Sequence, residues 1–196
     1  MEGDFMQERW PPIRLYLTGF MGCGKSTIGP LLARRLGYSF VDLDVLIERQ
    51  TGKTIPEIFA TGGEGAFRAV ERAVLRQTAM LEAYVIATGG GTLASEENLD
   101  WALRNGCVVY LQVSIEELVQ RLAPAARDRP MLQDWRRQPL QGAALRQRIA
   151  SLLRRREAWY LRAHCVVSTD GLSVAETVEA VLQALRVYRS SRNERR

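Results

Sequence analysis

The sequence predicts an α/β fold of three layers, in which a central parallel sheet of five strands is flanked by helices. Short apolar runs rich in β-branched residues alternate with longer amphipathic segments, which is the pattern of repeated strand and helix units. The chain has 196 residues, of which 46% are hydrophobic and 25% charged, values typical of one globular domain. No apolar run reaches the roughly 18 residues that a membrane-spanning helix needs.

The first strand and helix are predicted from the start of the periodic pattern. Ile13–Thr18 is an apolar run with aromatic and β-branched residues, which predicts a strand. Lys25–Leu36 places leucine and isoleucine at helical spacing and is followed by Gly37, which predicts a helix and its end. Ser39–Asp42 predicts the second strand.

Two helices and a third strand are expected next. The helices cover Val45–Gln50 and Gly65–Leu81, and the glycine, proline and threonine residues between them predict a break. Tyr84–Ala87 predicts the third strand. It leads directly into the triplet Gly89-Gly90-Gly91.

The second half of the chain continues the alternation. In order, it predicts a helix over Glu96–Arg104, a strand over Cys107–Gln112, a helix over Ile115–Leu122, a helix over Ala143–Arg162, a strand over Cys165–Ser168 and a helix over Val174–Val187. Residues 123–142 interrupt this pattern, with three prolines and four arginines and no periodicity. A long irregular segment inside one domain predicts a functional lid or, alternatively, a disordered segment.

Residues 1–196 are therefore expected to form one domain, with a core at about 13–187, a lid at about 123–142 and a basic C-terminal tail at 188–196. The formal net charge is +5, and the last eleven residues hold five arginines against one glutamate, so the remaining body is close to neutral. This distribution argues against nucleic-acid binding by the body. The tail is expected to be a solvated terminus, with contact to RNA or an acidic partner as the alternative.

Cys107 and Cys165, which lie in apolar runs, and the single histidine are expected to be structural. Cys23, Cys107 and Cys165 have no C-x-x-C spacing, so neither a zinc site nor a disulfide framework is predicted. His164 borders the last strand and is expected to support it. The N-terminal stretch Met1–Arg14 is charged and has no apolar core, so it does not resemble a secretory signal, and we expect a cytoplasmic protein.

The strongest motif lies between the first strand and the first helix. Gly19–Ser26 reads G-F-M-G-C-G-K-S and fits G-x-x-x-x-G-K-[ST] at every fixed position. Glycines let backbone amides converge on an anion, and the helix N-terminus adds its dipole. Lys25 can then reach the β- and γ-phosphates and the Ser26 hydroxyl can join Mg²⁺. The motif predicts binding of a nucleoside triphosphate.

The acceptor side is indicated by weaker motifs, each with an alternative. Asp42 and Asp44 end the second strand, where two carboxylates two residues apart can face the cleft, one toward a water of Mg²⁺ and one toward an acceptor hydroxyl. Alternatively, Asp44 caps the helix starting at Val45. Arg68 can hold a substrate carboxylate, or it forms an ordinary surface pair with Glu71 three residues on.

The motifs also exclude some classes of P-loop protein. No N-K-x-D motif is present, which argues against a GTPase, and one small domain suits a motor ATPase poorly. The Gly89–Gly91 triplet allows a backbone to approach a ligand closely, although a flexible turn would explain one or two of its glycines. A small-molecule kinase fits best.

Taken together and in this order, the motifs resemble those of shikimate kinases over about Leu15–Leu185. The shared motifs are G-F-M-G-C-G-K-S-T at Gly19–Thr27, D-L-D at Asp42–Asp44, G-E-G-A-F-R at Gly63–Arg68, G-G-G at Gly89–Gly91 and R-P-M-L at Arg129–Leu132. The resemblance implies a P-loop kinase fold and transfer of the γ-phosphoryl group of ATP to the 3-hydroxyl of shikimate, in chorismate and aromatic amino acid biosynthesis. It also implies ATP and Mg²⁺ as cofactors, a monomer and no membrane partner.

The resemblance further implies roles for individual residues. Nucleotide contacts fall on Gly22, Cys23, Gly24, Lys25, Ser26, Thr27, Arg121 and Arg129, and the metal on Ser26 and Asp42. Shikimate contacts fall on Asp44, Arg68, Gly89, Gly90, Gly91 and Arg156, with Phe59, Phe67 and Glu71 shaping the pocket. Lys25, Asp44 and Arg129 are implied as catalytic. No role transfers to the lid segment Gln133–Gly142 or to the stretch Thr169–Leu172.

Two rival functions remain open from sequence. A gluconate kinase would share the P-loop but not the D-L-D, F-R and G-G-G set. A non-catalytic sensor of shikimate or nucleotide would be expected to lack Lys25, Asp44 or Arg129, and all three are present.

Overall fold

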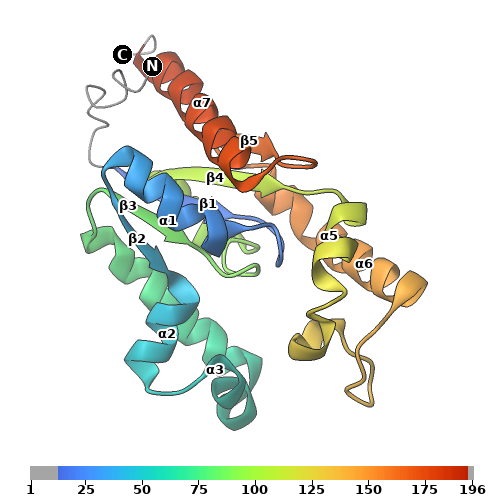
Figure 1. The fold of residues 1–196 in the computed structure, drawn as a ribbon. Helices are drawn as coiled ribbons and strands as arrows, with labels where there is room; N and C mark the ends of the chain where they lie inside the picture. Colours follow the sequence, from blue (N-terminus) through green and yellow to red (C-terminus); the bar gives the residue numbers. More distant parts are fainter. Residues whose placement is uncertain (1–12, 194–196) are drawn as a thin grey trace.

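The computed structural model describes residues 13–193 and contains one parallel sheet with helices on both faces (Figure 1). The strands are β1 (Arg14–Thr18), β2 (Ser39–Asp42), β3 (Tyr84–Ala87), β4 (Cys107–Gln112) and β5 (Cys165–Ser168), in the spatial order β2-β3-β1-β4-β5. The helices of this region are α1 (Lys25–Leu36), α2 (Leu43–Thr51), α3 (Ile55–Gln77), α4 (Glu96–Asn105), α5 (Ile115–Leu122), α6 (Gly142–Tyr160) and α7 (Val174–Asn193). The predicted fold class and all five strands are confirmed.

The alternation of side chains along β1 explains the layers. Leu15 and Leu17 point to a core that is closed by α1 and α7 together with α5 and α6, whereas Tyr16 points to a second core closed by α2, α3 and α4. Figure 1 shows α1 and α7 on one face of the sheet and α2 and α3 on the other. Because both faces are covered, the strands are apolar almost throughout.

Parallel strand pairing brings three loops to one edge of the sheet. Leu17 of β1 and Asp42 of β2 both lie in register with Ala87 of β3. The phosphate-binding motif Gly19–Ser26 (the P-loop), the segment Asp42–Asp44 and the triplet Gly89–Gly91 lie at or directly after these positions. They therefore meet at the carboxyl edge of the sheet. Ligands bind in this crevice in open α/β sheets.

The helix α3 is longer than expected. It begins at Ile55, ten residues before the predicted start at Gly65, with a capping box in which Thr54 accepts from the Glu57 amide and the Glu57 side chain accepts from the Thr54 amide. It continues through the glycines with a kink at Gly63, which has φ 70° and ψ −174°. The prediction underestimated the helix because glycines weaken local propensity, whereas tertiary packing holds both halves against one core.

The predicted lid is more ordered than expected. Two 3₁₀ turns, Ala126–Asp128 and Pro130–Leu132, are followed by an antiparallel bridge between Gln133 and Pro139. At the tip of this small hairpin Trp135 is 82% exposed. In Figure 1 the segment, coloured yellow to gold, extends away from the sheet beyond α5.

The C-terminal helix also exceeds its prediction. It was expected to end at Val187, but α7 continues to Asn193, so most of the supposed tail is helical. Residues 194–196, like the N-terminal stretch before Ile13, lie outside the described residues. Among residues 13–193, no helix is both long and apolar enough to cross a membrane.

Cys107, Cys165 and the histidine have the structural roles expected of them. Both cysteines are buried, and so is Cys23. The Nδ1 of His164 accepts a hydrogen bond from the Val108 amide at 3.0 Å, which ties the start of β5 to β4.

Candidate active site

The loop after β1 wraps around the Lys25 ammonium. Gly22 and Gly24 have φ values of 78° and 100°, in the left-handed region that side chains disfavour, so glycine is needed at these turns. The Lys25 Nζ donates to the carbonyl of Gly19 at 2.8 Å and to that of Phe20 at 3.0 Å. Lys25 is only 8% exposed and is the first residue of α1. Its positive charge therefore lies at the same helix end as the N-terminal amides, which also attract anions.

Cys23 contributes to the same loop. Its sulfur lies 3.3 Å from the Lys25 Nζ, and its side chain is buried. Thr27, the last residue of the motif, is exposed and its amide donates to the Gly24 carbonyl at 3.0 Å. The loop is therefore closed by its own backbone before any ligand is considered.

Ser26 and Asp42 form an oxygen pair beside the loop. The Ser26 hydroxyl donates to Asp42 Oδ2 at 2.6 Å, and Asp42 Oδ1 accepts from the Asp44 amide at 3.0 Å. Asp42 is thus the N-cap of α2, which starts at Leu43. The alternative that Asp44 caps a helix starting at Val45 is wrong, because the helix begins earlier and its cap is Asp42.

The hydroxyl and carboxylate oxygens of this pair suit Mg²⁺. Magnesium is a hard cation that is held by one or two protein oxygens together with phosphates and water. Ser26 and Asp42 supply two such oxygens, from α1 and from the end of β2, next to the phosphate loop.

Asp44 is held in an environment that disfavours its charge. Burial raises its pKa to about 6, and the nearby carboxylates of Asp42 and Glu71 add to the effect against the opposing influence of Lys25. The expectation that strand alternation orients Asp42 and Asp44 is wrong, since β2 ends at Asp42. Asp44 nevertheless faces the glycine triplet, because a Cβ built on Gly89 would lie 2.9 Å from Asp44 Oδ1.

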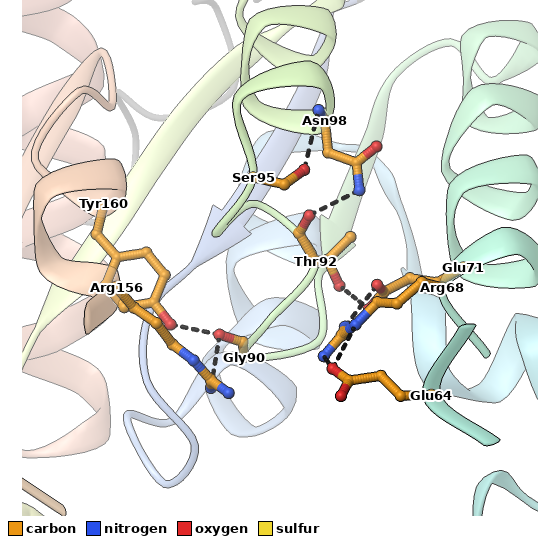
Figure 2. A network of polar contacts seen from close by, with 9 residues as sticks. All are labelled: Glu64, Arg68, Glu71, Gly90, Thr92, Ser95, Asn98, Arg156 and Tyr160. Carbon is orange, nitrogen blue, oxygen red and sulfur yellow. Dashed lines mark hydrogen bonds and ion pairs between the residues drawn. The ribbon is translucent and has the colours of Figure 1, made fainter. Parts of the chain in front are cut away.

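Arg68 is anchored by a buried carboxylate, that of Glu71, in addition to an exposed pair with Glu64 at 3.2 Å. Its Nη1 donates to Glu71 Oε2 at 2.7 Å, and Glu71 is 1% exposed. The other oxygen of Glu71 accepts from the Thr92 hydroxyl at 2.8 Å, and Asn98 Nδ2 donates to the Thr92 carbonyl at 2.9 Å. Figure 2 shows this chain of contacts from α3 to the start of α4. The alternative of an ordinary exposed pair with Glu71 is therefore wrong.

A second arginine approaches the glycine triplet from α6. The Arg156 Nη1 donates to the Gly90 carbonyl at 3.2 Å, and the Tyr160 hydroxyl donates to the same oxygen. Arg68 approaches from α3, where a Cβ on Gly91 would lie 3.0 Å from its Nη1. Figure 2 shows the two guanidinium groups on opposite sides of the turn.

A cavity of about 470 Å³ lies between these elements. Arg68 and Glu71 line it from α3, Gly91 from the turn and Arg156 from α6. Two further arginines that the sequence did not single out, Arg72 and Arg155, also line it. Glu64, Glu71 and Glu97 line the cavity as well, but the four arginines outnumber them, and guanidinium groups on two walls suit an organic anion.

The two remaining arginines predicted for the nucleotide side differ in their surroundings. Arg121, at the end of α5, donates to the Gly22 carbonyl at 3.4 Å and pairs with Glu117. Arg129 lies between the 3₁₀ turns of the lid, and within the described residues its Nε is buried without a hydrogen-bond partner. A buried cationic donor without an acceptor is costly, so an incoming anion would stabilise it.

Sequence reasoning missed three side chains of the network. Tyr160 has no role in the sequence analysis beyond lying in the helix predicted over Ala143–Arg162, although it follows Arg156 by four residues and therefore lies on the same helix face. Thr92 and Asn98 carried no signal in the sequence, because their contacts depend on how α4 packs beside α3.

Comparisons with known proteins point to one family. A family model described as "Shikimate kinase" matches residues 21–186. A protein named shikimate kinase from Chlorobium chlorochromatii is 44% identical over 177 residues, which is 90% of this chain and 93% of that protein.

Solved structures agree with this match. A shikimate kinase from Acinetobacter baumannii, solved in complex with shikimate, is 36% identical with a TM-score of 0.79, covering 91% of this chain and 95% of that one. A gluconokinase from Sinorhizobium meliloti has a TM-score of 0.59 at 18% identity, covering 95% and 99% of the two chains, which shows only the shared fold.

Proposed function

The chain belongs to the shikimate kinase family, and from this premise we propose that it transfers the γ-phosphoryl group of ATP to the 3-hydroxyl of shikimate, giving shikimate 3-phosphate and ADP. The observation that carries the proposal is the placement of two guanidinium groups, Arg68 and Arg156, around the glycine turn that directly follows the strand beside the P-loop. One crevice thus offers a phosphate loop and a carboxylate clamp.

The phosphate side is assigned to the loop and α1. Lys25 exchanges its contacts with the loop carbonyls for the β- and γ-phosphates of ATP, while the amides of Gly22, Cys23 and Gly24 surround them. Ser26 and Asp42 are the residues that would hold Mg²⁺. The ion supplies positive charge to the phosphates when it is bound.

Two lid-side arginines complete the nucleotide site. Arg121 is assigned to the base of the nucleotide, and its contact with the Gly22 carbonyl of the P-loop supports this. Arg129, whose Nε has no hydrogen-bond partner among the described residues, is assigned to the transferred phosphoryl group as the lid closes. Closure excludes water, which limits hydrolysis of ATP.

The acceptor side uses the cavity between α3 and α6. Arg68 and Arg156 hold the carboxylate of shikimate, and the backbone of Gly89, Gly90 and Gly91 lines the ring. Asp44 binds the hydroxyl groups, including the one that attacks. Because its carboxylate is ionised above about pH 6, it accepts a hydrogen bond from that hydroxyl at neutral pH.

Positioning and charge account for most of the rate in this proposal. Phosphoryl transfer passes through a loose transition state, in which a strong general base contributes little to the rate. Asp44 therefore orients the attacking hydroxyl rather than removing its proton early. Lys25 and Arg129 stabilise charge on the phosphoryl oxygens, whereas Arg68 and Arg156 keep the substrate carboxylate away from it.

The remaining parts of the proposal concern the state of the enzyme. We expect a monomer that works in the cytoplasm on two small-molecule substrates, without a membrane or nucleic-acid partner.

A coupled ADP-release assay tests the proposal. Purified protein is given Mg-ATP with shikimate, quinate, gluconate or no acceptor, and the product is identified by its mass. We expect ADP release that depends on shikimate and a product heavier by one phosphoryl group.

Other outcomes would reassign the protein. Release with gluconate alone would support a gluconate kinase. The nucleotide contacts of the P-loop would remain, and the shikimate contacts would be wrong. Binding of ATP without stimulation by any acceptor would favour the sensor function.

A further inference from the structure

We propose that Tyr160 is a positioning residue that holds the acceptor turn against the P-loop and so sets the distance between the two substrates. The inference rests on the proposed function, since it concerns the geometry of the same transfer. Tyr160 has no assigned role among the nucleotide, metal or acceptor contacts described above.

Tyr160 is buried and reaches a half-buried carbonyl of the turn through a directional contact. Tyr160 is 0% exposed, and its hydroxyl donates to the carbonyl of Gly90, 70 residues away in the chain. Its ring packs against Tyr110 of β4, with ring centroids 5.0 Å apart. The phenol is therefore fixed at both its ring and its hydroxyl.

The hydroxyl remains a donor over the working pH range. Burial raises the pKa of Tyr160 to about 12, so the group stays neutral and keeps its proton. The Tyr160 hydroxyl can therefore donate to the Gly90 carbonyl throughout this pH range.

Gly90 is the point at which the acceptor turn meets the nucleotide loop. A Cβ built on Gly90 would lie 3.2 Å from the amide nitrogen of Met21 and 3.6 Å from the carbonyl oxygen of Gly19. Both atoms belong to the P-loop. A shift of Gly90 therefore changes the spacing between the acceptor turn and the phosphate loop.

The Gly90 carbonyl accepts from two donors, Tyr160 and Arg156, and we assign them different roles. Arg156 also donates to the Gly90 carbonyl, at 3.2 Å, but it is assigned to the carboxylate of the acceptor. When its guanidinium turns to the acceptor, Tyr160 retains the Gly90 carbonyl. This half-buried carbonyl would otherwise lose both of its donors at the moment of reaction.

The variant Tyr160→Phe tests this role, because it removes one hydroxyl and keeps the ring. We expect kcat for shikimate to fall about tenfold, with the KM for ATP changed less than about twofold. We also expect more ADP to be released per shikimate 3-phosphate formed, because a loosened turn lets water compete with the acceptor hydroxyl. This coupling ratio is not moved by a loss of stability alone.

A matched control removes the neighbouring hydroxyl. Tyr110→Phe keeps the same ring stack but removes a phenol that is not bonded to the Gly90 carbonyl, and we expect wild-type kcat and coupling. If Tyr160→Phe has the kcat and coupling ratio of the wild type, or if Tyr110→Phe shows the same losses, the positioning role is wrong.

A second variant tests the spacing from the other side of the contact. Gly90→Ala places a methyl group against Met21 and leaves Tyr160 in place, so it serves if Tyr160→Phe does not fold. We expect the same fall in coupling, and less than additive losses in the double variant. Unchanged coupling in Gly90→Ala would overturn the inference. A wild-type protein without shikimate-dependent turnover would instead overturn the proposed function on which it rests.

Discussion

Neutralising Asp44 should make the ligand-free protein more stable while abolishing its activity. Three carboxylates, those of Asp42, Asp44 and Glu71, lie close together at the carboxyl edge of the sheet, and Asp44 is largely buried among them. Asp44→Asn keeps the size and shape of the side chain and removes one negative charge. It also removes the acceptor proposed for the shikimate hydroxyl.

The magnitude follows from the raised pKa. The folded protein holds the Asp44 proton more tightly than the unfolded chain does, with a pKa of about 6 against an ordinary 3.8. Stability is therefore lost as the pH rises from about 4 through about 6, and the loss is complete above that range. Two pKa units correspond to about 3 kcal/mol, which we reduce to about 2 to 3 kcal/mol because the group is partly exposed to solvent.

The assay is urea and thermal unfolding of the wild type and Asp44→Asn without nucleotide or Mg²⁺, at pH 4 and pH 7.5. At pH 7.5 we expect the Asp44→Asn substitution to raise the free energy of unfolding by about 2 to 3 kcal/mol and the Tm by about 4 to 12 °C. At pH 4 the two proteins should be nearly equal, since Asp44 is then protonated. Glu82→Gln, at an exposed carboxyl in the turn before β3, is the matched control and should change little.

Three results would refute this reasoning. The first is a variant no more stable than the wild type at pH 7.5, and the second is a stability gain of the same size at both pH values. The third is near-normal shikimate turnover in the variant, which would show that the carboxylate does not serve the acceptor hydroxyl. A gain in stability with a loss of activity is the signature of a strained functional group.

Lys25→Ala should reduce turnover by at least about 100-fold, because it removes the cation of the phosphate loop, and a near-normal kcat in the ADP-release assay would contradict the loop assignment. Arg68→Ala should raise the KM for shikimate by about 10- to 100-fold and leave the KM for ATP nearly unchanged, since a lost charge-assisted contact is worth about 1.5 to 3 kcal/mol; an equal loss of ATP affinity would make Arg68 structural. The exposed Trp135 should shift its fluorescence to shorter wavelength when Mg-ATP and shikimate are both added, and Trp135→Phe should lose that shift; unchanged emission would argue against lid closure.

The conformation of the loop between β1 and α1 could be predicted from the sequence alone. The P-loop is a short segment whose glycines and lysine act within a few residues of each other, so its pattern specifies its geometry, and the structure closes the loop around Lys25. The five strands were equally readable, because a sheet covered on both faces demands continuous apolar runs.

Errors in the element boundaries have tertiary causes. The glycines at 62, 63 and 65 weaken a helix in isolation, yet α3 runs through them because Ile58 and Phe67 are buried in the same core. The start of α2 at Leu43 was missed because either of two nearby aspartates could cap a helix, and only the packed structure selects Asp42.

The sequence by itself therefore determined the fold class, the phosphate loop and the set of acceptor-side motifs. Only the tertiary structure decided that Asp44 is buried beside two other carboxylates, that Glu71 is the anchor of Arg68, and that Tyr160 and Arg156 share one carbonyl. The physical reason is the distance along the chain over which the interactions act. Backbone conformation and apolar periodicity are set by neighbours along the chain, whereas the burial of a charge and the pairing of a donor depend on groups brought together from distant segments.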